Sequence, residues 1–80
     1  MQKISEWSEK DWEDSVRNLL KQELKERNLT YQDLVDRLGT IGVSEKEINL
    51  RNKLVRGKFS AVFFVQCLLA MGSDRIRLED

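Results

Sequence analysis

Apolar residues recur along the chain with the period of an α-helix, in four stretches. The first stretch runs from about Ser8 to Arg27, and Ser8 with Asp11 three residues later predicts a capped helix start. One stripe of this helix would carry Trp12, Val16, Leu19, Leu20 and Leu24. The spacing therefore predicts one long amphipathic helix at the start of the chain.

The second stretch is shorter and begins at Thr30, a good N-cap residue. Asp33 follows at the position that completes a capping-box-like pattern. Leu34, Val35 and Leu38 are expected to face inward, and Gly39 is expected to end this helix.

The third stretch opens with Ser44 and Glu47, which have the spacing of a full capping box. Gly57 is a natural residue to follow the end of this helix. The expected inward contacts are Ile48, Leu50, Leu54 and Val55.

The fourth stretch follows Ser60, another N-cap residue, with Phe59 placed to pack onto Phe63 or Phe64. Residues 61–71 are apolar almost all round, which predicts a central, buried helix ending before Gly72. Within it, Phe64 and Leu68 are expected to be deeply buried. The tail residues 75–78 alternate polar and apolar, as a short strand would.

Eighty residues, 40% of them hydrophobic and 35% charged, indicate one soluble globular domain spanning residues 1–80. The pattern predicts an all-α bundle of four main helices, with an N-terminal arm (1–7) and a short C-terminal extension (73–80). The chain has no histidine and one cysteine, which excludes Cys/His zinc sites, Ser-His-Asp triads and an internal disulfide. We therefore expect no metal, no cofactor and no enzymatic activity.

The start of the chain lacks a basic segment followed by an apolar one, so no signal peptide is predicted. The longest apolar segment, residues 61–71, is about half of the ~20 residues that a membrane span needs. A cytoplasmic location without membrane contact is the expectation.

The net charge is zero, but the charges are unevenly distributed. Residues 1–14 hold two basic and five acidic side chains, whereas residues 44–59 hold five basic and two acidic ones. A basic stripe on one short helix is typical of a nucleic-acid reader, and it is also common on solvated helix faces. The candidate DNA-binding residues are Asn49, Arg51, Asn52, Lys53, Arg56 and Lys58.

The order of these features resembles the lambda-repressor-like helix-turn-helix family, of the Cro or xenobiotic-response type. The resemblance covers about residues 16–72. The segments that carry it are Leu29 and Thr30, Leu34, residues 42–44, Ile48, residues 56–58 and residues 68–72. It implies that the second and third helices form the helix-turn-helix, with the third in the major groove. The whole chain is also similar to a set of small bacterial and phage-associated domains without an assigned activity.

The chain departs from that family at several positions. Residues 39–42 lengthen the turn, Tyr31 stands where many members have a phosphate-binding glutamine, and Val35 replaces a small alanine. Glu45 and Glu47 are expected in the first turn of the third helix, where carboxylates repel the DNA backbone. DNA contacts are therefore expected from the later half of that helix.

The remaining chemistry-bearing residues favour packing over function. Trp12 and the three phenylalanines are expected in the core, and Trp7 either caps the first helix or marks an interface. Cys67 is expected to be a buried, unreactive thiol, since no cation or base is indicated beside it. The acidic pairs Asp11/Asp14 and Asp33/Asp36 read as surface carboxylates rather than catalytic dyads.

These patterns predict a small transcriptional regulator that binds duplex DNA. The alternative is a protein-interaction module of the same fold, such as an antitoxin-like or inhibitory partner. A weak homodimer is also predicted, with its seam in the C-terminal tail, the Trp7 segment or both. The alternative is a monomer in which these residues fold over the ends of its own core.

Overall fold

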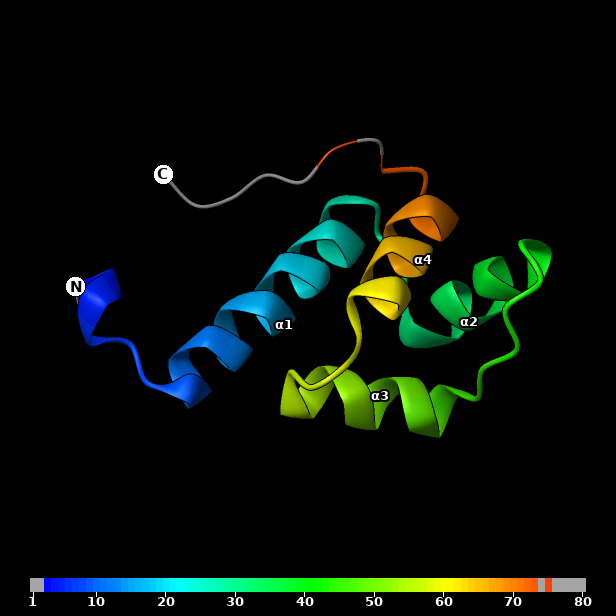
Figure 1. Cartoon of the computed structure of the whole chain (residues 1–80). Coiled ribbons are helices and arrows are strands. Elements are labelled where there is room, and N and C mark those ends of the chain that lie inside the picture. Colours follow the sequence, from blue (N-terminus) through cyan, green and yellow to red (C-terminus); the bar gives the residue numbers. More distant parts are fainter. Residues whose placement is uncertain (1–2, 74, 76–80) are drawn as a thin grey trace.

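The computed structural model describes residues 3–73 and residue 75, and these residues form an all-α domain (Figure 1). A short 3-10 turn, η1 (Ile4–Glu6), precedes four α-helices: α1 (Glu9–Glu26), α2 (Tyr31–Thr40), α3 (Glu47–Arg56) and α4 (Ala61–Met71). Both α1 and α2 pack against α3 and against α4. The predicted all-α fold with four main helices is confirmed.

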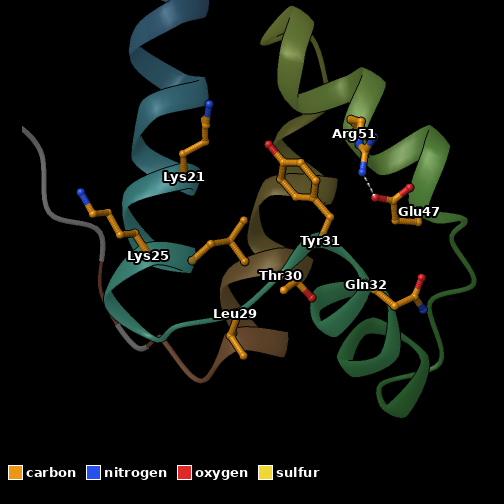
Figure 2. A pocket seen from close by; sticks show the side chains of 9 residues that line it. Lys21, Lys25, Leu29, Thr30, Tyr31, Gln32, Glu47 and Arg51 are labelled. Carbon is orange, nitrogen blue, oxygen red and sulfur yellow. Dashed lines mark hydrogen bonds and ion pairs between the residues drawn. The ribbon is translucent and has the colours of Figure 1, made fainter.

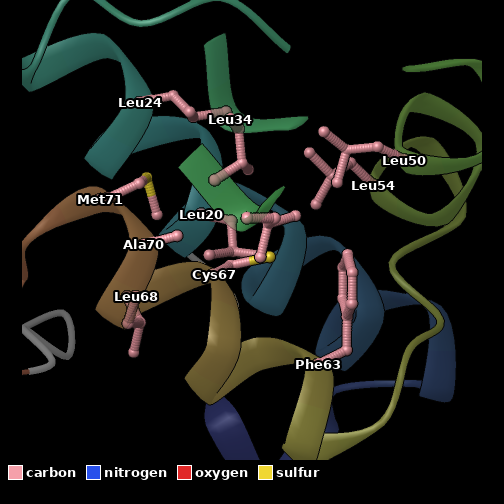
Figure 3. Packing of buried hydrophobic residues seen from close by; sticks show 11 residues of the cluster. Leu20, Leu24, Leu34, Leu50, Leu54, Phe63, Cys67, Leu68, Ala70 and Met71 are labelled. Atoms are coloured by element: carbon pink, nitrogen blue, oxygen red, sulfur yellow. The ribbon is translucent and has the colours of Figure 1, made fainter. Parts of the chain in front are cut away.

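The core lies between the helices, and each of them contributes to it (Figure 3). Six side chains are fully buried: Leu20, Leu34, Leu38, Leu50, Leu54 and Cys67. Leu68, Ala70 and Met71 extend this cluster along α4. The predicted inward positions of α2 and the central leucines of α3 are thus confirmed.

Most of the predicted helix starts are present as side-chain caps. Ser8 and Asp11 form a reciprocal capping box on α1, and Thr30 and Asp33 form another on α2. The backbone N–H of Thr30 donates to Asp33 and holds the pKa of that carboxyl below its ordinary value. Ser60 caps α4, and Phe59 packs against both Phe63 and Phe64, as expected.

The predicted capping box at Ser44 is wrong. The N-cap of α3 is Lys46, which makes no side-chain cap hydrogen bond, so the helix begins two residues later than expected. The carboxylate that was expected to reach back, that of Glu47, pairs with Arg51 instead.

The predicted end of α2 at Gly39 is also wrong. The helix continues through Gly39 to Thr40, and the residue with positive φ is Gly42. The N–H of Val43 donates to the carbonyl of Leu38 at 2.9 Å, which is the closing bond of a Schellman motif.

Several predicted core residues lie at the surface. Ile48 and Val55 are 55% and 59% exposed, because α3 buries only its Leu50 and Leu54 side. Trp12 is 47% exposed and packs edge-on against Trp7, with ring centroids 4.6 Å apart. Phe64 is half-buried rather than deeply buried, whereas Leu68 is buried as predicted.

The helix α4 is not buried all round. Val62, Val65 and Leu69, which we call the α4 stripe, are 66%, 49% and 64% exposed. The stripe is open because the backbone of α4 lies close only to α1 and α2 among the described helices. The expected strand at residues 75–78 lies outside the described residues, apart from Arg75, which is not in a strand.

No single described helix is long and apolar enough to cross a membrane. Taken together, α3 and α4 have the required length and composition, but a bend of 118° lies between them.

Candidate nucleic-acid interface

The side of α3 that lies opposite its buried leucines carries a single charged residue. Because Leu50 and Leu54 point into the core, the opposite side of the helix is exposed. We call this side the outer face; its residues are Ile48, Asn49, Asn52, Val55 and Arg56. It combines two amides, one guanidinium and two aliphatic side chains, with no carboxylate.

Arg51 and Glu47 lie beside the outer face rather than on it. The Arg51 guanidinium donates to the Glu47 carboxylate one helical turn earlier. It also lies over the Tyr31 ring, with its Cζ atom 5.7 Å from the ring centroid. Arg51 is therefore shared between a carboxylate and an aromatic ring of α2.

Lys53 is held on the other side of α3. Its Nζ atom is 2.8 Å from Oε2 of Glu45, whose side chain is only 10% exposed. The same ammonium lies 4.2 Å from the centroid of the Phe63 ring. Glu45 thus neutralises a cation near the core instead of facing outward.

Lys58 and Arg56 complete the basic stretch near the end of α3. Lys58 is 3.7 Å from a carboxylate oxygen of Glu13, but its side chain is 69% exposed. Arg56 is exposed and makes no ion pair with any residue that the structure describes. Of the six candidate DNA-binding residues, the structure therefore places Asn49, Asn52 and Arg56 together on the outer face.

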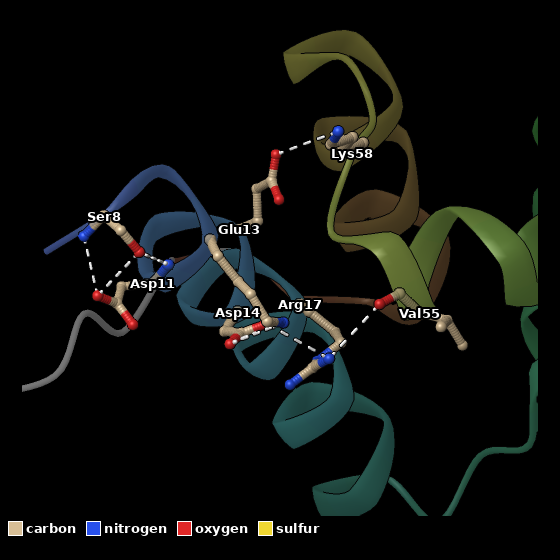
Figure 4. Close-up of polar contacts among 8 residues, drawn as sticks. Ser8, Asp11, Glu13, Asp14, Arg17, Val55 and Lys58 are labelled. Carbon is tan, nitrogen blue, oxygen red and sulfur yellow. Dashed lines mark hydrogen bonds and ion pairs between the residues drawn. The ribbon is translucent and has the colours of Figure 1, made fainter.

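The C-terminal end of α3 is fixed against α1 (Figure 4). The Arg17 guanidinium donates to the carbonyl of Val55 at 3.4 Å and pairs with Asp14 at the same distance. Gly57 has φ of +65°, and its Cα approaches the backbone of Glu13 so closely that a Cβ would lie 2.3 Å from the Glu13 carbonyl oxygen. These contacts set the direction in which α3 presents its outer face.

A hollow of about 420 Å³ opens beside the outer face, where α1, α2 and α3 meet. Its floor is apolar and aromatic: Leu24 is buried, and Leu29 and Tyr31 pack against the core cluster. Figure 2 shows the Tyr31 ring between α1 and α3, with its hydroxyl directed toward Lys21. We call this feature the α1–α2–α3 hollow.

Three cations surround this hollow. Lys21 and Lys25 come from α1 and Arg51 comes from α3, while Glu47 is the only carboxylate among its lining residues. Lys25 extends outward at the edge (Figure 2). Neither lysine forms an ion pair within residues 3–73 or with residue 75.

Cys67 has no role at this surface. Its side chain is fully buried, and burial raises the pKa of the thiol to about 12, with the charge of Glu45 acting in the same direction. Among the described residues, no three His, Cys, Asp or Glu side chains are grouped as a metal site would require.

A family model described as a domain of unknown function, DUF6471, matches residues 12–76. The chain belongs to this family. No curated protein and no solved structure is significantly similar to it.

The DUF6471 match begins inside α1 and extends beyond α4, so the outer face and the α1–α2–α3 hollow both lie within the family domain. Sequence reasoning missed the hollow, because it treated the charged side of α1 as paired. A signal was nevertheless present: Lys21 and Lys25 are one turn apart, and neither has an acidic residue three or four positions away.

Proposed function

We propose that this DUF6471 domain binds duplex DNA and places the outer face of α3 in the major groove. In this proposal α2, residues 41–46 and α3 act as the helix-turn-helix, consistent with the packing of α2 against α3. The observation that carries it is the composition of the outer face, which presents Asn49, Asn52 and Arg56 without a carboxylate.

The chemistry of these side chains suits base edges. An asparagine amide can pair with the N6 and N7 atoms of adenine, and an arginine with O6 and N7 of guanine. Aliphatic side chains such as Ile48 and Val55 suit the methyl group of thymine. Glu45 and Glu47, whose charges would repel the DNA backbone, form ion pairs with Lys53 and Arg51 respectively.

The same ion pairs limit the expected affinity. Lys53 and Arg51 are engaged within the protein, which leaves Arg56, Lys58 and the N-cap residue Lys46 as the exposed cations near α3 for phosphate. With few phosphate contacts, a single domain should bind weakly and with a shallow salt dependence, since each contact contributes ~0.9 to the log–log slope.

The first prediction tests this interface by titrating the protein into labelled duplex DNA at several salt concentrations. The double variant Asn52→Ala/Arg56→Ala should lose at least about tenfold in affinity, because a bidentate base contact is worth ~1–3 kcal/mol. The matched control Asn18→Ala/Arg37→Ala removes the same side chains from exposed positions on α1 and α2. Absence of binding at low salt, or equal losses in both variants, would exclude the outer face as a DNA reader.

A second candidate function, a protein-interaction module, is favoured by the α4 stripe. Three large aliphatic side chains exposed on one helix face commonly mark a protein contact. We propose this function as the alternative should duplex DNA not bind.

A further inference from the structure

We propose that the α1–α2–α3 hollow binds a small organic phosphate with a flat apolar body, of the class of a free nucleoside monophosphate. This site lies beside the proposed DNA-reading face, and no residue of the outer face lines the hollow. Its existence does not depend on DNA binding, and the two are tested independently.

The charge around the hollow selects an anion. Three cations against one carboxylate leave an excess of two positive charges, although the chain as a whole is neutral. Lysine is a common phosphate-binding residue, acting as a point charge.

The floor of the hollow selects an apolar body next to the anionic group. Leu24, Leu29 and Tyr31 form a surface that inorganic phosphate would leave uncovered. The volume of about 420 Å³ lies within the ~300–1,000 Å³ typical of small-molecule sites. A flat ring resting on this floor would leave its phosphate group at the edge of the hollow, near Lys21.

Glu47 is an internal competitor for the ligand. Its carboxylate accepts a hydrogen bond from the Arg51 guanidinium at the edge of the hollow, and so occupies a donor that a phosphate oxygen would use. A bound phosphate would replace Glu47 as the partner of Arg51, and removal of the Glu47 charge should therefore strengthen binding.

The ligand class is tested by titrating the full chain with adenosine monophosphate, adenosine and inorganic phosphate, and following amide chemical shifts by NMR. Adenosine monophosphate should bind at least about tenfold more tightly than adenosine or inorganic phosphate alone. A tenfold ratio needs only ~1.4 kcal/mol of binding free energy from the group that each of these lacks. The shifts should concentrate at residues 21–32 and 47–51. Equal affinity for the nucleotide and one fragment, or shifts spread over the whole surface, would overturn the proposal.

Variants test the roles of the residues. The double variant Lys21→Gln/Lys25→Gln should weaken nucleotide binding about tenfold or more. The control Lys3→Gln/Lys10→Gln removes the same charge from exposed positions far from the hollow, and should have little effect. In contrast, Glu47→Gln should strengthen binding several-fold, which a merely structural role of Glu47 would not produce.

A last experiment distinguishes a site for a free nucleotide from a site for the DNA backbone, because both ligands carry a phosphate group. Blunt duplex DNA is added to the protein loaded with adenosine monophosphate. Retention of the nucleotide supports the small-molecule site. Its displacement would assign the hollow to the DNA backbone and overturn the proposal.

Discussion

Alanine at Gly57 should lower the free energy of unfolding more than alanine at Gly42. Both Gly57 and Gly42 have positive φ, so alanine at either position carries the left-handed cost of ~1–2 kcal/mol. At Gly57 the new Cβ would also meet the Glu13 carbonyl oxygen at 2.3 Å, whereas at Gly42 nothing lies within 4 Å. Gly57→Ala should therefore lose ~3 kcal/mol or more in urea unfolding, and Gly42→Ala about 1–2 kcal/mol. Equal losses would show that α1 and α3 are not locked at this contact.

At the same scale, local pairs were predictable from the sequence and distant pairs were not. The Ser8–Asp11 and Thr30–Asp33 boxes join residues three apart, so spacing alone identifies them. Lys58 and Glu13 lie on segments that only the fold brings together. Lys53 and Lys58 therefore looked free in the sequence, although each has a carboxylate partner in the structure.

Among the elements, helix number followed from apolar periodicity, but the burial of each face depended on its neighbours. Every residue of α4 except Gln66 is apolar, and packing against the neighbouring helices decides which side is covered. Similarly, Ile48 and Leu50 are both aliphatic, and sequence spacing could not show that α3 buries one and exposes the other. The sequence thus placed the candidate site on α3, but it could not show which residues of α3 form the exposed outer face.

Neighbouring residues on α3 give a direct test of this orientation. Leu54 is fully buried and Val55 is 59% exposed. Leu54→Ala should cost ~2–5 kcal/mol through lost burial and the cavity left behind, whereas Val55→Ala should change stability by no more than ~0.5 kcal/mol. Chemical denaturation of both variants measures the difference. Similar losses from the two substitutions would mean that α3 is rotated relative to the described packing.

Across the whole molecule, the α4 stripe is the surface best suited to a second copy of the chain. Val62, Val65 and Leu69 are spaced by three and four residues, the repeat of a coiled-coil seam. The helix carries no charged residue, so two identical copies would meet without repulsion. The seam predicted at the Trp7 segment is less favoured, because Trp7 and Trp12 already pack on each other.

An antiparallel α4 pair about a two-fold axis would place Val65 against its own copy and Val62 against Leu69 of the other chain. Two copies would also supply two outer faces, which offsets the few phosphate contacts of one domain. We predict a weak homodimer whose mass in sedimentation equilibrium rises with concentration. Val65→Glu should abolish this rise by placing two carboxylates at the axis, whereas Ile48→Glu, an equally exposed aliphatic position on α3, should leave it intact. A constant monomer mass, or a dimer that survives Val65→Glu, would show that α4 does not form the dimer contact. The α4 stripe would then support the alternative proposal, a protein-interaction module.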